Sequence, residues 1–388
     1  MKKKNLFFAL LIAMVVGGFT ACGEDDPVTP AIDPTSYSFD KLPEDTGIQP
    51  TKAEMDVVVA HFVDAIVLPT YVELENKMAA LKTAVDQFET SLSQNDLDDA
   101  CQAWRDARRP WEQSEAFLYG PADLKKLDPS LDSWPLDKNG IEEIIASGDW
   151  GAIDGEVNED EDAADAPQNL RGFHTAEKLL FNDGDPREVK TFEKNELIYL
   201  QKVINRMLSD VQTLHKAWTD GLGSQDTEVP TAYGAALKAH DGKNYSLSSV
   251  YVAIETMLNG DNGMAGISNE VGTSKIQDPV DKWNGGDREA GVLAVESWYS
   301  WNSLDDYYDN IISIKNCYLG GRNENYETEK SLSALVKKIN PTLDSLMTVQ
   351  IEATLEAIND IPHPFRNNLD KATEITNATD ACATLTKG

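Results

Sequence analysis

Residues 169–182 read NLRGFHTAEKLLFN, and this stretch has the spacing of a short amphipathic helix. His174 and Glu177 lie three residues apart, so they share one face of such a helix. The rest of that face is apolar, with Leu170 before the pair and Phe181 after it. A buried carboxylate is costly unless it is paired or bound to a cation. We therefore expect this stretch to carry the functional chemistry.

A second stripe runs through the predicted helix Leu97–Leu118, where large apolar residues recur at helical spacing. Arg108 and Glu115 fall on this stripe among tryptophans, and Pro110 predicts a kink. Two helical turns, about 10 Å, separate Arg108 from Glu115, so each is expected to meet a partner from another helix. A buried ion-pair network is one explanation of these charges, and a binding site is the other.

Most of the remaining chain also has helical spacing, and no long alternating strand pattern is present. Residues 121–150 and 260–286 are expected to be mainly loops, apart from a short helix over Gly140–Ala146. The polar stretch 219–230 is the predicted domain boundary. The sequence therefore predicts an all-α fold of two helical-bundle domains, 51–222 and 223–388. The other expected helices are Tyr71–Leu92, Phe192–Trp218, Leu247–Leu258, Glu289–Leu319, Glu327–Asn359 and Phe365–Thr373.

The N-terminus has the pattern of a bacterial lipoprotein signal. Three lysines precede the apolar run Leu6–Gly18, which is shorter than the ~20 residues that span a bilayer. Small residues then lead to Cys22, the expected lipid attachment site, so residues 1–21 are the predicted signal peptide and 22–50 a flexible tether. The run Gly23-Glu24-Asp25-Asp26 resembles a surface-export signal of Bacteroidetes lipoproteins. It favours an outer-membrane lipoprotein facing the cell surface over a periplasmic one, and an ordinary cleaved signal is the alternative.

The chain is strongly acidic, with 34 basic and 66 acidic residues among 388 and a formal net charge of −32. A surface this negative repels nucleic acid and anionic lipid, so neither is an expected partner. The acidic loop Asp154–Ala166 is either a solvated loop or a funnel for cations. Cys101, Cys317 and Cys382 match no zinc motif in their spacing, and no disulfide is predicted.

Four motifs, in order along the chain, resemble those of the imelysin family, the insulin-cleaving membrane-protease-like proteins. The most specific is Gly172-x-His174-x-x-Glu177, which resembles the family's GxHxxE motif. The resemblance spans about residues 50–360 and implies two helical bundles with a site in the groove between them, a link to bacterial iron or other metal uptake, and a nominal peptidase activity. The other similar stretches are Trp104-Arg105 with Trp111–Phe117 and Gly120-Pro121, then Ser133–Asp137, then Glu296–Ser300 through Asp306, Asn310 and Tyr318–Gly320.

The residues themselves predict a metal site. His174 and Glu177 are the expected ligands, with Glu115 as a third if its helix packs beside them. One imidazole with carboxylates suits iron, manganese or zinc, so the expected cofactor is a divalent or ferric ion, iron or zinc. In the absence of a metal, a neutral His174 would be hydrogen-bonded to Glu177 or Glu115. The resemblance adds Ser300, Asp306 and Asn310 to the site region, where interhelical hydrogen bonds are the alternative role. Arg108, from its own buried stripe, is the fourth residue expected to contribute to binding.

Two functions follow from these residues. The first is a cell-envelope lipoprotein that captures a metal ion or iron-bearing ligand for uptake, with an outer-membrane partner. The second is an imelysin-type metallopeptidase that cleaves extracellular polypeptides, which would need a general base and an electrophilic partner; Glu112 and Arg108 are the candidates. Zinc proteases of the HExxH kind place two histidines one turn apart. This motif has one histidine, which favours binding.

Overall fold

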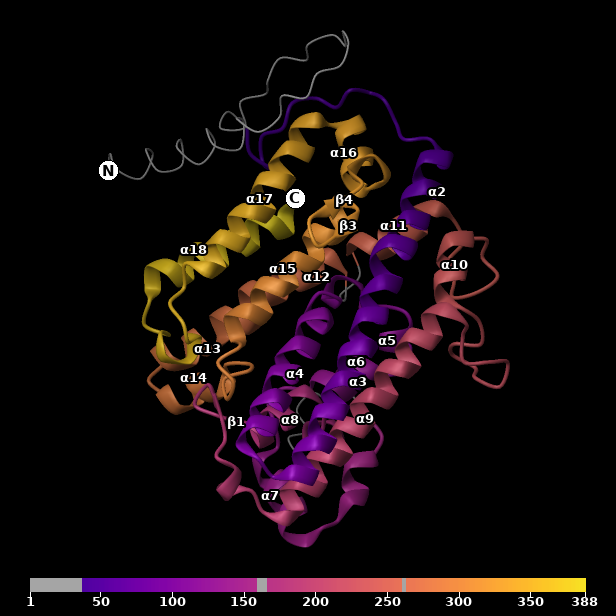
Figure 1. Ribbon diagram of the computed structural model, residues 1–388. Coiled ribbons are helices and arrows are strands. Elements are labelled where there is room, and N and C mark those ends of the chain that lie inside the picture. The colour runs from indigo at the N-terminus through magenta and orange to yellow at the C-terminus, as the bar shows by residue number, and fades with distance from the viewer. Residues whose placement is uncertain (1–36, 159–165, 260–262) are drawn as a thin grey trace. The chain divides into compact units, whose positions relative to one another are not determined.

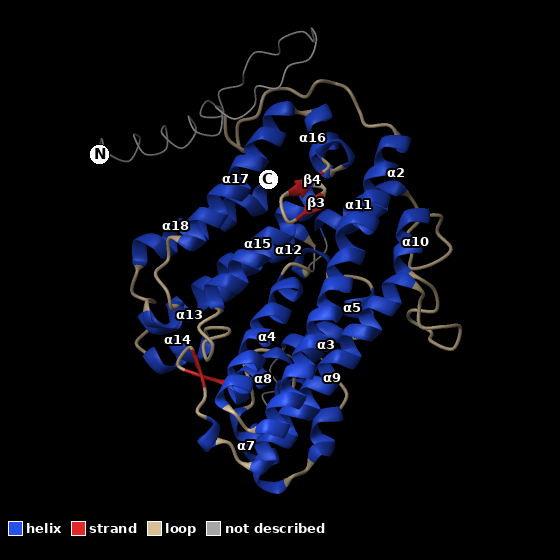
Figure 2. Ribbon diagram, in the orientation of Figure 1, coloured by secondary structure: helices blue, strands red, loops and turns tan. Residues whose placement is uncertain are grey.

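The structure is a computed structural model that describes residues 37–158, 166–259 and 263–388. The predicted signal peptide, Cys22 and the start of the tether lie outside the described residues, as does most of the acidic loop. The described chain is helical apart from loops and two short hairpins, so the predicted all-α class is confirmed (Figures 1 and 2). Its elements are the α-helices α2 (Lys52–His61), α3 (Leu68–Ser91), α4 (Gln94–Glu112), α5 (Pro121–Leu124), α6 (Leu127–Asp132), α7 (Lys138–Ser147), α8 (Gly172–Leu180), α9 (Lys194–Thr219), α10 (Tyr233–Ala239), α11 (Val250–Asn259), α12 (Met264–Glu270), α13 (Asp278–Asn284), α14 (Arg288–Ala294), α15 (Ser303–Leu319), α16 (Leu332–Ile339), α17 (Pro341–Asn359) and α18 (Ala372–Lys387).

The first half of the chain is built on one continuous helical run, in which a π-helical segment, η2 (Phe62–Val67), joins α2 to α3. Thr51 begins the run with a capping box to Glu54. This π-helical segment lies directly before Pro69 and relieves the clash that a proline makes with an α-helical turn. By length and composition the run Lys52–Ser91 would reach across a bilayer; half of its most apolar window is buried inside the fold, as in a core helix.

The helices α4 and α9 pack along α3, and α8 packs against both α4 and α9 (Figure 1). Trp104 of α4 fixes α8, because its ring lies edge-on to Phe173 and its Nε1 donates to the Phe173 carbonyl at 3.0 Å. This contact holds the start of α8, where the motif histidine lies, against the bundle core.

The second half of the chain packs around α15. This helix contacts α12 and α17 from the second half of the chain and α4 from the first half. Buried apolar side chains from both halves form one continuous cluster. The division into two domains at residues 222 and 223 stays a prediction. The described end of the predicted tether is hydrogen-bonded to this half: Thr46 N donates to Ile339 O at 2.9 Å, and Asn340 Nδ2 donates to Pro43 O at 3.2 Å.

Two antiparallel hairpins of the same design follow α8 and α15. β1 (Phe181–Asn182) pairs with β2 (Asp185–Pro186), and β3 (Gly321–Arg322) pairs with β4 (Asn325–Tyr326). Both turn residues of each hairpin have positive φ, which matches the twist of a two-residue hairpin loop.

Several stretches hold more helix than predicted, among them the following three. Residues 121–150 contain α5 and α6 ahead of α7. The last helix, α18, runs almost to the C-terminus, and only a short 3₁₀ turn (Phe365–Asn367) lies where the last helix was predicted. The predicted loop 260–286 forms α12, a π-helical segment η7 (Val271–Gln277), and α13. Val271 and Ile276 are both buried although five residues separate them, a spacing that a π-helix accommodates and that a search for α-helical spacing misses.

The predicted long helix Glu289–Leu319 is wrong, because the chain leaves the helix between α14 and α15. Ser297 and Trp301 take positive φ values of 50° and 63° in this interval. Tertiary contacts replace the helical hydrogen bonds there: Ser300 N donates to Glu177, and the Ser300 carbonyl accepts from Arg105. The polar stripe expected along this helix is therefore divided between a loop and the start of α15.

The predicted helix Leu97–Leu118 also ends early, at Glu112. Ser114 N and Ser114 Oγ both bond to the Trp111 carbonyl, at 2.8 and 2.6 Å, and the chain continues as the 3₁₀ helix η3 (Glu115–Phe117). Glu115 therefore leaves the stripe that it was predicted to share with Arg108.

Candidate functional site

Gly172, the first residue of the motif, allows α6 to approach the start of α8. Its φ is +84°, and a Cβ at this position would lie 2.3 Å from the carbonyl oxygen of Leu131. Glycine satisfies both the backbone conformation and the close contact. The approach places Asp132, at the end of α6, beside His174 in the first turn of α8. Gly172 thus shapes the site through the backbone.

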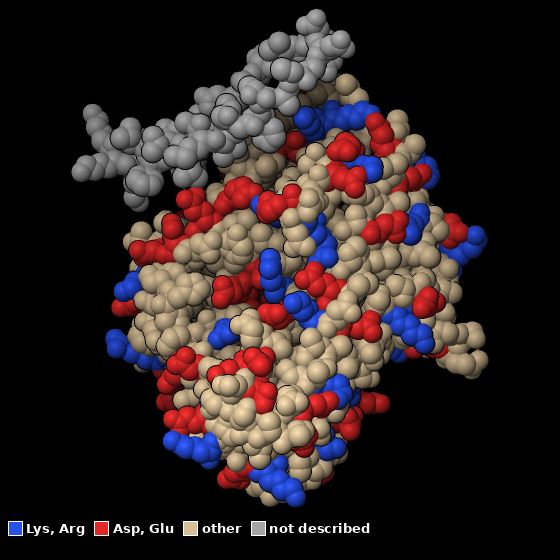
Figure 3. Space-filling view, in the orientation of Figure 1, with Lys and Arg blue, Asp and Glu red and all other residues tan. Residues whose placement is uncertain are grey.

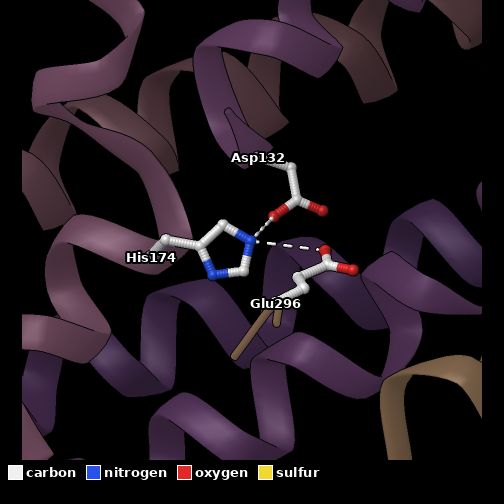
Figure 4. Close-up of side chains that lie close together, drawn as sticks. All are labelled: Asp132, His174 and Glu296. Carbon is white, nitrogen blue, oxygen red and sulfur yellow. Dashed lines mark ion pairs between the residues drawn. The ribbon is translucent and has the colours of Figure 1, made fainter. Parts of the chain in front are cut away.

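His174 is fully buried and points its Nε2 between two carboxylates (Figure 4). The Nε2 atom lies 3.0 Å from Asp132 Oδ1 and 3.3 Å from Glu296 Oε1. Trp134 covers the ring edge-on, with centroids 4.8 Å apart. Burial and the charge of Arg108 act to lower the pKa of His174, but Asp132 and the contact with Glu177 outweigh them and raise it to about 10. In this arrangement the imidazole is a cation between acids.

Glu177 is fully buried, and both of its carboxylate oxygens have partners. Oε1 accepts from Ser300 N at 2.7 Å and from Ser300 Oγ at 2.8 Å. Oε2 lies 3.3 Å from His174 Nδ1. A carboxylate on one ring nitrogen fixes the orientation of the imidazole and presents the other nitrogen to a ligand. The pair His174–Glu177 therefore exists as predicted, and the loop between α14 and α15 holds it in place.

Arg108 lies at the centre of a buried ion-pair network. Its guanidinium contacts Glu112 at 2.6 Å, Glu296 at 2.8 Å and Asp306 at 3.2 Å, and it also pairs with Asp132. Arg108 is fully buried, so it neutralises part of a large internal negative charge. The sequence predicted such a network as one of two explanations for this residue.

The other polar residues predicted for the site join the same network. Asn310 Nδ2 donates to Glu112 Oε2 at 2.5 Å, and Ser297 Oγ donates to Asp306 Oδ2 at 2.5 Å. The structure therefore brings together most of the predicted site residues. We call this set the buried cluster: Arg108, Glu112, Asp132, His174, Glu177, Glu296, Ser300, Asp306 and Asn310.

A polar pocket of about 370 Å³ opens beside the buried cluster and has walls from both halves of the chain. We call it the acidic pocket, and Glu115, Asp128, Glu270 and Lys275 are its charged lining together with Asp132. Glu115 was predicted as a companion of His174. The structure groups it instead with Glu112 and Asp132, whose ligand oxygens lie within 4.8 Å of one another.

Carboxylates outnumber cations in the cluster and the pocket, and the pKa values reflect this imbalance. Burial raises the pKa of Glu112 and Glu115 well above the usual range, and burial with the nearby Asp132 raises the pKa of Asp128 to about 7. Glu296 differs: burial acts to raise its pKa, but Lys275 and the cluster's cations lower it to about 2. Protons thus take the place of missing cations at several of these acids.

Sequence reasoning missed two acids that contact His174. Asp132 lies in a stretch that was expected to be a loop, and only its position just before the Ser133–Asp137 motif marked it. Glu296 was quoted within a motif but was placed on a helix that the structure breaks. No local pattern links either residue to His174, because the contact depends on how α6 and the loop before α15 pack against α8.

Comparison with known proteins places the chain in a family. The family model for imelysin matches residues 67–388. The chain belongs to the imelysin family. Among curated proteins, this imelysin-family chain is 27% identical over 317 residues to iron-regulated protein A of Synechococcus elongatus, covering 79% of this chain and 76% of that protein.

Solved structures of imelysin-like proteins share the fold. A protein described as an iron-regulated protein A precursor, from Parabacteroides distasonis, is 61% identical and superimposes with a TM-score of 0.88, covering 90% of this chain and 97% of that one. An imelysin-like protein from Psychrobacter arcticum has a TM-score of 0.62 at 12% identity, over 87% of this chain and 94% of that one. The second likeness shows the fold alone. Both share the helical architecture of this chain.

Proposed function

We propose that this imelysin-family protein is a cell-envelope metal-binding protein, which holds a divalent or ferric ion, iron or zinc, at Asp132, His174 and Glu296. The observation that supports this proposal is the convergence of three ligand atoms, one nitrogen and two oxygens, within 4.8 Å of one another. They come from α6, α8 and the loop before α15, so the site joins both halves of the chain.

The distances in this group suit a metal ion. Ligand atoms bound at about 2.0–2.2 Å lie roughly 3.0–3.5 Å apart at tetrahedral or octahedral angles. The two distances from His174 Nε2, 3.0 and 3.3 Å, fall in this range. Nε2 lies between the two carboxylates, and a metal ion bound there would replace the proton that Nε2 holds in the metal-free protein. One imidazole with carboxylate oxygens suits iron, manganese or zinc.

Iron is the favoured metal because of the relatives. Two of them carry the name iron-regulated protein A, one at 61% identity across most of both chains. We propose the same physiological setting here: a lipoprotein anchored through Cys22, facing the cell surface, that passes its metal to an outer-membrane uptake partner. These parts of the proposal rest on the sequence of residues 1–36 and on the relatives' names.

Calorimetry on metal-free protein tests the proposal, with Fe²⁺ under anaerobic conditions, Fe³⁺, Zn²⁺ and Mn²⁺ as separate titrants. We expect micromolar or tighter binding of at least one ion, with at least a tenfold loss in His174→Ala and in Asp132→Asn. His215→Ala is the matched control, since His215 forms a histidine–carboxylate pair with Glu75 at 2.6 Å on the outer side of the first bundle. Binding weaker than millimolar for every ion, or binding unchanged in His174→Ala, would overturn the proposal.

A metallopeptidase of the imelysin type is the alternative. The structure assigns other partners to the two residues predicted for its chemistry: Arg108 contacts four carboxylates, and Glu112 contacts Arg108 through one oxygen and Asn310 through the other. Zinc-loaded protein incubated with insulin chain and casein separates the two functions. Chelator-sensitive cleavage that disappears in Glu177→Ala would favour the peptidase.

A further inference from the structure

The acidic pocket adjoins the proposed metal site through Asp132. This residue lines the pocket, and its Oδ1 also faces His174 Nε2. The opposite wall comes from α12 and η7, which contribute Glu270 and Lys275. The pocket is therefore continuous with the buried cluster, and a ligand in it lies beside the cluster's ligand atoms.

Two acids in the pocket lack partners. Glu115 is only 8% exposed, and within the described residues neither Glu115 nor Asp128 makes a side-chain hydrogen bond or ion pair. The pocket's lysine is engaged elsewhere, because Lys275 Nζ lies 2.8 Å from Glu296 and 3.8 Å from Glu270. Buried carboxylates are normally paired. Their orientation toward an open polar space indicates that the missing partner is a ligand from solution.

The charge of this region decides the sign of that ligand. The cluster and the pocket together hold the eight carboxyl groups of Glu112, Glu115, Asp128, Asp132, Glu177, Glu270, Glu296 and Asp306. Three cations face them, Arg108, Lys275 and the protonated His174, so the acids stay in excess and some of them hold protons that an entering cation can displace. A low-dielectric cavity with one sign of charge concentrates ions of the opposite sign and repels its own. On the face drawn in Figure 3, acidic and basic side chains are interspersed.

The volume limits the ligand's size. At about 30 Å³ for each water, an ion with six waters needs about 180 Å³, which the pocket of about 370 Å³ admits. Carboxylate oxygens are hard ligands that can replace those waters one at a time.

We propose, on the basis of the metal-binding function above, that the metal reaches the site as an aquated divalent cation and not as an anionic ferric chelate, and that the acidic pocket is its first binding position. Glu115 and Asp128 capture the hydrated ion. Asp132, shared by pocket and cluster, carries it toward His174. A chelate whose own surface is carboxylate or catecholate oxygen meets the same acids and is repelled.

Stopped-flow and equilibrium binding on the full mature chain test this inference, with aquated Mn²⁺ and Fe²⁺ and with ferric citrate as the probes. We expect binding of the aquated ions and at least 100-fold weaker binding of ferric citrate. In the double variant Glu115→Gln with Asp128→Asn, the association rate of Mn²⁺ should fall about five- to tenfold at low salt, with a flatter dependence on ionic strength. Both substitutions replace a carboxyl group by an amide of the same shape at a position with no side-chain hydrogen bond or ion pair in the described residues, so the variant should stay folded by circular dichroism.

Glu143→Gln is the matched control, because it removes one exposed carboxylate from α7 without touching the pocket. Its association rate should equal that of the unsubstituted protein. Ferric citrate binding as tightly as the aquated ions, or an unchanged association rate in the double variant, overturns the inference and leaves the metal-binding function standing. Failure of every probe to bind overturns both.

Discussion

The substitution Arg108→Met removes the central cation of the buried cluster and keeps a side chain of similar length. Four carboxylates then lose their shared partner: Glu112, Asp132, Glu296 and Asp306. Replacing a whole buried ion pair by apolar residues is often harmless, but removal of one partner strands the others. The remaining acids must take up protons or repel one another inside the fold.

The expected destabilisation is about 3–5 kcal/mol, the range for breaking a buried pair from one side. For a chain of this size that corresponds to a fall in Tm of roughly 4–7 °C. The neighbouring arginine provides the control on the same helix. Arg109 is 64% exposed and its ion pair with Asp309 is long, at 3.9 Å, so Arg109→Met should change stability by less than about 1 kcal/mol.

Urea unfolding of chelator-treated protein, followed by circular dichroism and tryptophan fluorescence, measures the difference. Chelation is needed because a bound metal ion would compensate for the lost guanidinium. Adding Zn²⁺ or Mn²⁺ should then stabilise Arg108→Met more than the unsubstituted protein. The reasoning is refuted if Arg108→Met lies within 1 kcal/mol of Arg109→Met, since the four carboxylates would then not depend on this cation.

Three further predictions concern single residues. Burial is the main cause that raises the pKa of Asp309 to about 7, above its value in the unfolded chain. The stability that protonated Asp309 contributes is therefore complete below about pH 4 and is lost as pH rises through 7. Asp309→Asn should therefore gain roughly 2–4 kcal/mol relative to the unsubstituted protein between pH 5 and pH 8 in urea unfolding, and exposed Asp305→Asn should show no such gain. Gly172→Ala should lower stability by more than about 2 kcal/mol and reduce soluble yield, because its Cβ meets the Leu131 carbonyl at 2.3 Å; an unchanged Tm would contradict this contact. Lys275→Met should tighten Mn²⁺ binding severalfold in calorimetry by freeing Glu296, and weaker binding would show that the lysine supports the site.

The local sequence was sufficient to predict the helices that bury a regular stripe. α3, α9 and the His174–Glu177 pair on α8 occur where helical spacing placed them, because an amphipathic helix fixes both its own geometry and its buried face. The pattern failed where backbone groups find partners outside their own helix. Ser300 donates its N–H to Glu177, which is 123 positions away, and no local signal reports such a bond.

The sequence by itself determined the helical class, the imelysin resemblance, and the burial of a histidine and a glutamate on one face of α8. Periodicity and motif spacing carry this information, because both are properties of neighbouring residues. Only the tertiary structure decided which acids face His174. Asp132 reaches it because Gly172 lets two backbones approach, and Glu296 reaches it because the chain leaves the helix before α15. The site is made by packing between distant segments, and that packing depends on contacts that sequence spacing does not encode.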